Sequence, residues 1–328
     1  MTTTTTRSRA ARKMGAPEPI AALNRVRILE TGEPLVDIRR SCPGVAVREE
    51  CCPYLRATVA EMLNAAVARL PQGYGFQVGT ALRTLAMQKR HWDAYYRSVC
   101  REHPEWPLSA RRRATNRFFA PYDQPAPPGH CTGGAVDVVL VGADGRPVDV
   151  SSPLERWDAA YTWSDRISPE ARARRMVLVE AMLGAGFSNC REEYWHYSWG
   201  DSAWAVRVGE DTCPYGLTPA PVAVEAFHDG AAAGRIERIG ADAWLCAPAP
   251  LGAGARTALD VCVQWSQGRP IELRVAPAVP RLFASADRKR WSLLPARLER
   301  GALVISLVPG VERLFVASEP APATSDSA

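Results

Sequence analysis

Two short segments of the sequence combine residue types that suit acid–base or metal chemistry. The first is His130-Cys-Thr-Gly-Gly-Ala-Val-Asp137, in which a histidine on a glycine-rich turn precedes an aspartate inside an apolar run. The second is Glu193-Tyr-Trp-His196, in which a carboxylate and an imidazole flank two aromatic residues. The chain has only five histidines, so a metal or acid–base site must draw on very few candidates.

The surroundings of Asp137 favour a metal. A carboxylate among alanine and valine residues needs a compensating partner, because an unpaired buried charge is costly, and a divalent cation compensates it well. Ligation by His130, Asp137 and His196 leaves the fourth zinc position open, as catalytic sites require. Glu193 is then the unligated base that takes a proton from water, and the chemistry is amide hydrolysis. Each segment alone also fits an ordinary surface or core histidine.

These segments resemble a known family. They match the His-x-x-Gly-x-Ala-x-Asp and Glu-x-Trp-His motifs of the zinc D-alanyl-D-alanine dipeptidases of VanX type, within the D-Ala-D-Ala metallopeptidase/hedgehog-like superfamily. The resemblance covers roughly residues 35–215 and extends to Gly200-Asp201, Trp204 and Arg83. It implies an α+β fold, with a small antiparallel sheet and helices around one zinc ion per chain.

The resemblance also implies individual roles. The zinc ligands are His130, Asp137 and His196, the catalytic base is Glu193, and Arg83 stabilises the developing oxyanion. The family holds the free amino group of its substrate with an acidic residue after the first motif, and Asp158 is the best match. Glu155 competes for that role, and a surface acid at the start of a helix is an equally good interpretation of either residue.

The pattern of apolar residues places these candidates on structural elements. Helical spacing predicts helices over 52–71, 83–102 and 168–187, while short apolar runs predict strands over 74–82, 135–141 and 193–199. Arg83 therefore lies at a strand-to-helix junction, and residues 105–129 are rich in Pro and Arg and only weakly periodic. Glu193 and His196 are three residues apart and would point to opposite faces of a strand. Glu193 must therefore lie at the end of the strand or on a bulge if both are to reach one site.

Composition changes after about Tyr215, where a proline-rich stretch leads into short alternating segments typical of an all-β module. We expect a disordered tail over 1–20, a catalytic domain over 21–217, a β-rich module over 218–318 and a second tail over 319–328. Trp244, Trp265 and Trp291 would form a sugar-stacking platform on this module, although aromatic residues in small β domains more often belong to the core. Self-association through the module is equally open.

Charge and cysteine content limit the other possibilities. The net charge of +5 over 328 residues does not indicate a nucleic-acid partner, and no stretch approaches the length of a membrane span. With no signal peptide apparent and nine cysteines in no metal or disulfide pattern, we expect a cytoplasmic protein with reduced thiols. We interpret His91, His103 and His228 as structural, since none has a Cys, Asp or His partner at ligand spacing. Cys131 is interpreted as a bystander, because adjacent side chains on an extended segment point apart.

The sequence therefore predicts zinc-dependent hydrolysis of D-alanyl-D-alanine or a similar D-containing dipeptide. One alternative is a D,D-carboxypeptidase or peptidoglycan endopeptidase whose β module binds the wall. A second alternative is a non-enzymatic, zinc-stabilised binding domain, against which the combination of Glu193 and Arg83 argues.

Overall fold

The computed structural model describes residues 18–226, 235–250, 257–266 and 268–318, and the chain forms two compact units, residues 1–219 and 220–328. Most of the predicted N-terminal tail, all of the predicted C-terminal tail and His228 lie outside the described residues. Residues 18–20, which were predicted to belong to the tail, are described, and Ile20 begins the short helix α2 (Ile20–Leu23).

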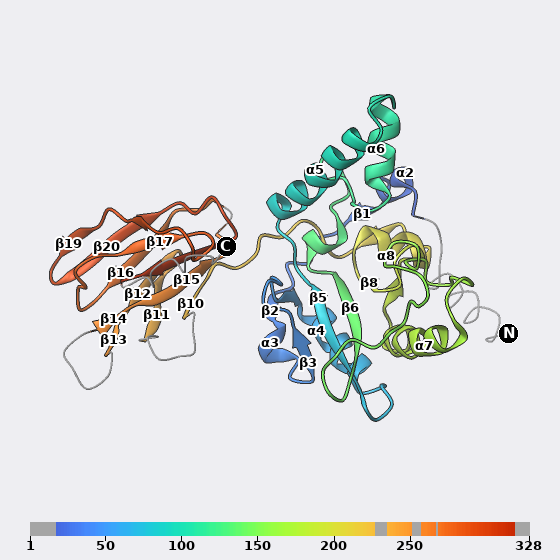
Figure 1. Ribbon diagram of the computed structural model, residues 1–328, viewed down its shortest axis with the longest axis horizontal. Coiled ribbons are helices and arrows are strands. Elements are labelled where there is room, and N and C mark those ends of the chain that lie inside the picture. The colour runs from blue at the N-terminus through green and yellow to red at the C-terminus, as the bar shows by residue number, and fades with distance from the viewer. Residues whose placement is uncertain (1–17, 227–234, 251–256, 267, 319–328) are drawn as a thin grey trace, which may run out of the picture. The chain divides into compact units, whose positions relative to one another are not determined.

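A five-stranded sheet forms the centre of the N-terminal unit (Figure 1). Its strand order is β3-β5-β6-β8-β7, and only the β3–β5 pair is parallel. The predicted α+β class with a small, largely antiparallel sheet is confirmed. The strands are β3 (Val45–Val47), β5 (Tyr74–Thr80), β6 (Ala135–Gly142), β8 (His196–Ser198) and β7 (Ser188–Asn189).

Two amphipathic helices, α4 (Ala57–Val67) and α7 (Pro169–Gly184), share one apolar core with this sheet. Helix α7 begins as its sequence predicts, because the Ser168 side chain accepts a hydrogen bond from the Ala171 amide and a proline occupies the first turn. Strand residues of the core alternate along the chain, and they are Phe76, Val78, Val136, Val138 and Leu140. Polar residues between them therefore face away from the core.

Three predicted boundaries need correction. Residues 54–56 begin no helix but form strand β4 (Tyr54–Arg56), which pairs with β2 (Leu35–Asp37). The weakly periodic stretch 105–129 contains helix α6 (Leu108–Asn116), which packs against α5 (Leu85–Glu102). Strand β8 starts only at His196, since residues 192–195 form a turn. For β4, pairing with β2 overrides the local helical pattern.

The remaining elements of this unit are short. Helix α3 (Ile38–Ser41) follows β2, the 3₁₀ turn η1 (Gly129–Thr132) precedes β6, and α8 (Ser202–Val208) follows β8. Strands β1 (Arg27–Ile28) and β9 (Thr212–Cys213) pair in parallel. No helix among the described residues is long and apolar enough to cross a membrane, and all nine cysteines are unpaired.

The C-terminal unit is an all-β module, as predicted. One sheet has the order β10-β15-β21-β17-β18 and the other β11-β12-β16-β20-β19. The first contains β10 (Ala223–Ala226), β15 (Asp260–Gln264), β21 (Arg313–Ala317), β17 (Phe283–Ser285) and β18 (Ser292–Leu293). The second contains β11 (Ile236–Gly240), β12 (Ala243–Cys246), β16 (Ile271–Val275), β20 (Ala302–Leu307) and β19 (Arg297–Glu299). Strands β13 (Ala249–Pro250) and β14 (Thr257–Ala258) form a separate pair.

The three tryptophans of this module do not form a common platform. Trp244 and Trp265 are only 4% and 2% exposed, so their ring faces are not accessible to a sugar. Trp291 is partly exposed and packs beside Cys262 and Phe315. The structure therefore assigns two of the three to the interior.

Candidate metal and catalytic site

Asp137 and His196 face each other across neighbouring strands. The register of the antiparallel pair β6–β8 places them directly opposite, and the core residues Val136, Val138 and Tyr197 alternate with them. Because successive side chains in a strand point to opposite faces, both polar groups lie on the face away from the apolar core. Two strands far apart in the sequence thus present a carboxylate and an imidazole at one point.

His130 reaches the same point from the turn η1. Its Nδ1 lies 2.9 Å from the Ala81 carbonyl oxygen, and its own carbonyl accepts a hydrogen bond of 2.9 Å from the Arg83 amide. The glycine-rich sequence around it is required by close packing. A Cβ atom on Gly129 would lie 2.4 Å from Asp201 Oδ2, and one on Gly134 would lie 2.7 Å from the Trp199 carbonyl oxygen.

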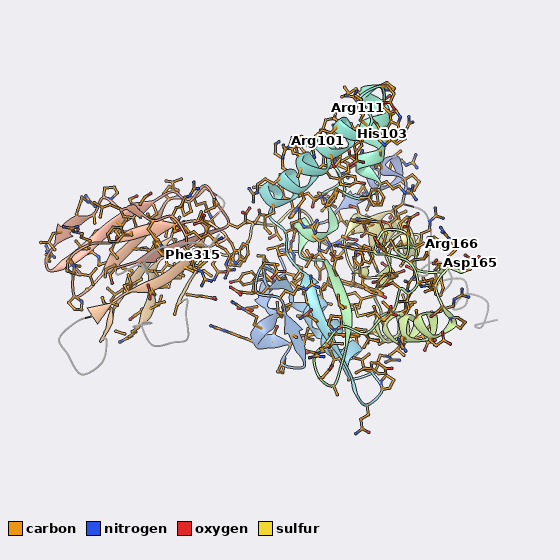
Figure 2. The ribbon with its side chains drawn as sticks, viewed as in Figure 1. Arg101, His103, Arg111, Asp165, Arg166 and Phe315 are labelled. Atoms are coloured by element: carbon orange, nitrogen blue, oxygen red, sulfur yellow. The ribbon has the colours of Figure 1, made fainter. Side chains whose placement is uncertain are left out.

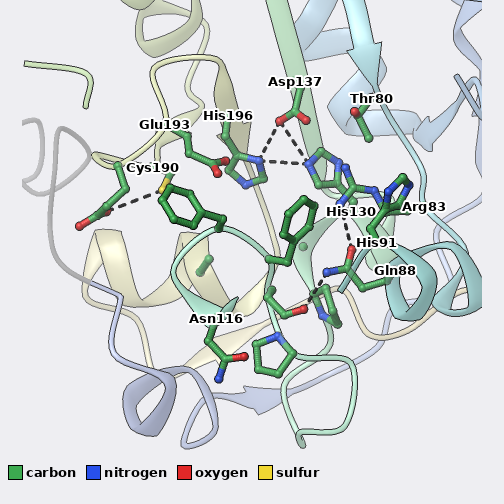
Figure 3. A pocket seen from close by; sticks show the side chains of 18 of the residues that line it. Thr80, Arg83, Gln88, His91, Asn116, His130, Asp137, Cys190, Glu193 and His196 are labelled. Atoms are coloured by element: carbon green, nitrogen blue, oxygen red, sulfur yellow. Dashed lines mark hydrogen bonds and ion pairs between the residues drawn. The ribbon is translucent and has the colours of Figure 1, made fainter. Parts of the chain in front are cut away.

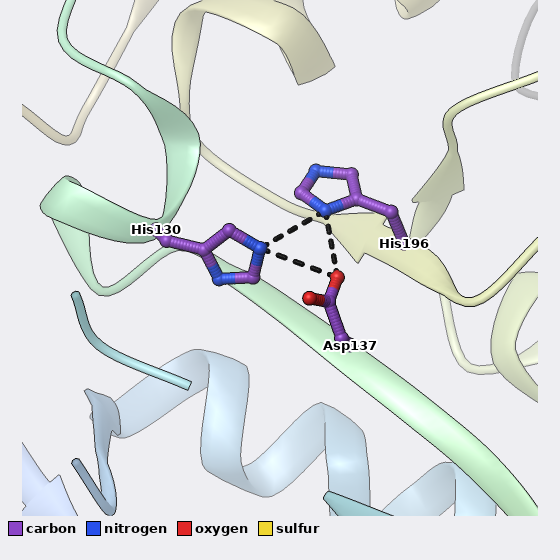
Figure 4. Close-up of side chains that lie close together, drawn as sticks. All are labelled: His130, Asp137 and His196. Atoms are coloured by element: carbon purple, nitrogen blue, oxygen red, sulfur yellow. Dashed lines mark hydrogen bonds and ion pairs between the residues drawn. The ribbon is translucent and has the colours of Figure 1, made fainter. Parts of the chain in front are cut away.

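The three side chains meet through three atoms (Figure 4). His130 Nε2 lies 3.2 Å from Asp137 Oδ1 and 3.1 Å from His196 Nδ1, and His196 Nδ1 lies 3.0 Å from the same carboxylate oxygen. Since the Ala81 carbonyl accepts from His130 Nδ1, the lone pair of His130 is on Nε2. Burial lowers the pKa of His130, which favours this neutral form.

This donor set fits a metal ion. A proton on His196 Nδ1 can hydrogen-bond to His130 Nε2 or to Asp137 Oδ1, but not to both. At least one of the three contacts therefore joins two atoms that both carry lone pairs. Zinc bonds of about 2.0–2.1 Å in tetrahedral geometry place ligand atoms roughly 3.3 Å apart, close to the observed spacing. Burial raises the pKa of Asp137, but His130 and His196 outweigh it, so the carboxyl stays ionised.

A second group of donors, Glu18, Cys190 and Glu192, lies in the same cleft. Both of its carboxylates are already bound: Glu18 accepts from the buried Arg207 at 2.7 Å, and Glu192 accepts from Arg191 at 2.5 Å. The group formed by His130, Asp137 and His196 is therefore the better candidate for a metal site.

Glu193 lies in the turn immediately before β8. Its amide donates to the Cys190 carbonyl and its own carbonyl accepts from the His196 amide, at 3.2 and 3.0 Å. The turn removes the strand geometry that would point Glu193 and His196 apart, and Figure 3 shows the carboxyl beside the His196 ring. Burial raises the pKa of Glu193 to about 7, against the opposing influence of the nearby His196. A carboxyl with a pKa near 7 suits a general base.

This raised pKa predicts a pH-dependent stability for the metal-free protein. An unfolded Glu193 ionises near pH 4.5, whereas the folded one keeps its proton to about pH 7, so stability is lost as the pH rises through that window. We expect Glu193→Gln to have the wild-type pH profile below pH 4.5 and to gain about 1–3 kcal/mol by pH 8. Urea unfolding with chelator from pH 4 to 8 measures the difference, and a difference independent of pH would contradict the assignment.

Arg83 follows the end of β5 and lines a cleft of about 620 Å³ together with the three donor residues and Glu193 (Figure 3). Its Nη1 donates to Gln88 Oε1 at 2.9 Å, and Gln88 Nε2 donates to the Ala120 carbonyl at 2.7 Å. Gln88 thus holds the guanidinium group in place. Gln88 carries no signal in the sequence, because it looks like any polar residue on the helix.

Aromatic side chains also line the cleft. The rings of Phe118 and Trp157 make an edge-to-face contact with centroids 4.8 Å apart. The rings of Trp157 and Trp195 make another, with centroids 6.0 Å apart. Arg156 lies over the rings of Trp157 and Trp195, at 4.9 and 5.2 Å from their centroids. These aromatic residues therefore line the same cleft as the donor atoms.

The other predicted positions differ in their relation to this cleft. Asp158 is exposed and lines an adjoining cavity rather than the cleft itself, and Glu155 lines neither. His91, interpreted as structural, lines the cleft but is not among the donor groups that the described residues form. His103 stacks on Trp106 with centroids 3.7 Å apart. Cys131 is fully buried and lines neither space.

A buried arginine supports the loop behind Glu193. Arg175 is fully buried, and its guanidinium donates to the carbonyls of Val150 at 2.7 Å and Tyr161 at 2.8 Å. It also lies over the Tyr194 ring, 4.1 Å from the centroid. It ties α7 to residues 150–161, which carry Trp157 and Asp158.

Replacing this arginine should unfold the protein more easily. Arg175→Met leaves buried carbonyls without donors, so we expect a loss of about 3 kcal/mol or more in the free energy of unfolding. The exposed Arg172 on the same helix is the matched control, and Arg172→Met should cost less than about 0.5 kcal/mol. Equal urea midpoints for the two variants would contradict this role for Arg175.

Three converging metal donors, a partly buried carboxyl group beside them and a guanidinium group held by Gln88 are typical of the site of a metal-dependent hydrolase. Residues 52–212 match the model of the M15 peptidase family, described as D-ala-D-ala dipeptidase. This match confirms the predicted family resemblance, and the matched segment contains every predicted site residue.

Individual relatives are more distant. A D-alanyl-D-alanine dipeptidase of a Synechocystis species is 26% identical over 183 residues, which span 48% of this chain and 74% of that protein. A Zn(II) complex of a mutant of the vancomycin-resistance D,D-pentapeptidase VanY is 16% identical, with a TM-score of 0.33 over 58% of this chain and 96% of its own. A putative carboxypeptidase A from Shewanella denitrificans is 23% identical, with a TM-score of 0.26. The alignment covers 29% of this chain and only 28% of that carboxypeptidase.

Proposed function

We propose that this protein is a zinc-dependent peptidase that hydrolyses D-alanyl-D-alanine or a similar D-containing dipeptide. The observation that carries the proposal is the convergence of His130, Asp137 and His196 on one point of a cleft that also contains Glu193 and Arg83. The M15 family match and the dipeptidase relative support the substrate class.

Each step of the hydrolysis has a residue of this chain to carry it. Zinc held by His130, Asp137 and His196 would act as a Lewis acid for the scissile carbonyl and lower the pKa of a water at its open position. Glu193 takes a proton from the attacking water as the carbon–oxygen bond forms, and passes it to the leaving amine as the carbon–nitrogen bond breaks. Arg83 donates hydrogen bonds to the oxyanion that develops on the carbonyl oxygen.

This role for Arg83 predicts a specific kinetic defect. Arg83→Ala should lower kcat by about 10²–10³-fold, because one donor to the developing oxyanion is lost, while zinc content stays at one per chain. Arg101→Ala, near the other end of α5 (Figure 2), is the matched control and should behave like the wild type. If Arg83→Ala raised only KM, then Arg83 would bind the substrate's ground state and the oxyanion role would be wrong.

A D,D-carboxypeptidase acting on longer peptides is the second candidate, and the size of the cleft favours it. Pockets of about 300–1,000 Å³ hold drug-sized ligands, and D-alanyl-D-alanine is smaller than these. The test compares amine release from free D-Ala-D-Ala with release from an N-acylated peptide that ends in D-Ala-D-Ala. Cleavage of the free dipeptide alone supports the dipeptidase, whereas cleavage of the acylated peptide establishes the carboxypeptidase.

A further inference from the structure

A second cavity of about 320 Å³ adjoins the main cleft at Glu193. Phe118, Trp157 and Glu193 line both spaces, so a substrate held for attack beside Glu193 has direct access to this cavity. The methyl side chains of D-alanyl-D-alanine would leave it empty. The cavity therefore has room for a larger side chain on one residue of the substrate.

The charged groups around this cavity indicate which side chain. Arg117 and Arg166 both line it, and among the described residues neither guanidinium has a carboxylate within ion-pair distance. Arg117 lies over the Phe118 ring, and Arg166 lies on the surface of the unit beside Asp165 (Figure 2). A planar guanidinium group binds a carboxylate through two parallel hydrogen bonds, so a pair of such groups favours an anionic ligand.

The acidic residues of the cavity limit the ligand further. Glu192 is bound by Arg191, but Asp158 is exposed and has no ion pair with a described residue. Three acidic residues therefore line the cavity beside its two guanidinium groups: Glu192 is paired with Arg191, the Glu193 carboxyl lies beside His196, and Asp158 remains for an ammonium group. An acidic residue at the N-terminus of a dipeptide matches this arrangement, because it carries an ammonium group and a side-chain carboxylate.

Apolar walls complete the match. Trp157 and Tyr161 are 42% and 44% exposed, which is unusual for such large aromatic side chains, and both line the cavity. They would flank the methylene groups of a glutamate-length side chain while its carboxylate reaches Arg117 and Arg166.

We propose that the second cavity, lined by Arg117 and Arg166, is a specificity pocket for an acidic N-terminal residue, so that the site prefers dipeptides such as D-Glu-D-Ala over neutral ones. This inference rests on the proposed peptidase function and adds the side chain that the site selects.

The test compares two dipeptides of the same shape, D-Glu-D-Ala and D-Gln-D-Ala, with the zinc-loaded protein. We expect kcat/KM to favour D-Glu-D-Ala by about tenfold or more, equivalent to 1.4 kcal/mol. In the double variant Arg117→Gln/Arg166→Gln the ratio should fall to about one. Arg113→Gln, an exposed arginine of α6 outside this cavity, should keep the wild-type ratio. Equal kcat/KM for the two dipeptides, or a preference that survives the double variant, would overturn the proposal.

A binding measurement separates this inference from the proposed function. Calorimetry with the zinc-loaded Glu193→Gln variant gives the Kd of each dipeptide without turnover. A lower Kd for D-Glu-D-Ala that depends on Arg117 and Arg166 supports the pocket even if no dipeptide is cleaved, and equal Kd values refute it. Turnover of D-Ala-D-Ala by the wild-type protein tests the peptidase function independently.

Discussion

Glu193→Gln is expected to lower kcat by about 10²–10⁴-fold while leaving one zinc ion per chain. The amide has nearly the shape of the carboxyl group but cannot accept the proton of the attacking water. Because Glu193 is not among the three converging donors, its replacement should not affect zinc retention. Steady-state amine release, together with elemental analysis of the same sample, measures both quantities.

Glu192→Gln provides the matched control, because Glu192 is the adjacent carboxylate and is bound by Arg191. We expect that variant to keep kcat close to that of the wild type, because the Glu192 carboxylate is held by Arg191 and is not part of the donor group formed by His130, Asp137 and His196. Near-normal turnover in Glu193→Gln would exclude Glu193 as the base. Loss of zinc from it would instead make Glu193 a ligand.

His196→Ala should abolish stable zinc binding and with it all activity. The substitution removes one of three donor atoms, which lies 3.0–3.1 Å from the other two. Zinc at about 1,000 times its Kd should stabilise the wild-type protein by about 4 kcal/mol, and it should not stabilise the variant. Thermal melts with zinc and with chelator measure this difference.

The control for this variant is His103→Ala, since His103 stacks on Trp106 and belongs to neither donor group. It should show the full zinc-dependent rise in Tm. A stoichiometric zinc content in His196→Ala would exclude His196 as a ligand. It would indicate the second donor group, Glu18, Cys190 and Glu192, as the metal site.

The site was predictable because its residues stand out against their neighbours. Asp137 interrupts an apolar strand, and the few histidines of the chain leave little choice of partner. The sequence could not show how Glu193 and His196 act together, because the turn at residues 192–195 depends on hydrogen bonds within the folded chain. Strand β4 was missed for a similar reason, since its residues continue the apolar pattern of the helix and pair with β2 only in the folded protein.

The supporting residues carried weaker signals. Arg175 stands in a run of arginines, yet it lies four residues after the buried Ala171 and three before the buried Leu178, which places it on the inward stripe of α7. Helical spacing could therefore have identified it. Arg117 and Trp157 carry no such signal, because their approach across the cavity depends on the folding of two separate loops.

Zinc-dependent peptide hydrolysis by this protein is tested most directly by a zinc titration of the metal-free protein, with amine release from D-Ala-D-Ala as the readout. We expect activity to rise in proportion to added zinc, to saturate at one equivalent per chain, and to be absent from His196→Ala at every zinc concentration. Amine release that persists in the chelated protein would contradict this expectation, as would a fully zinc-loaded protein that releases no amine from any D-containing dipeptide.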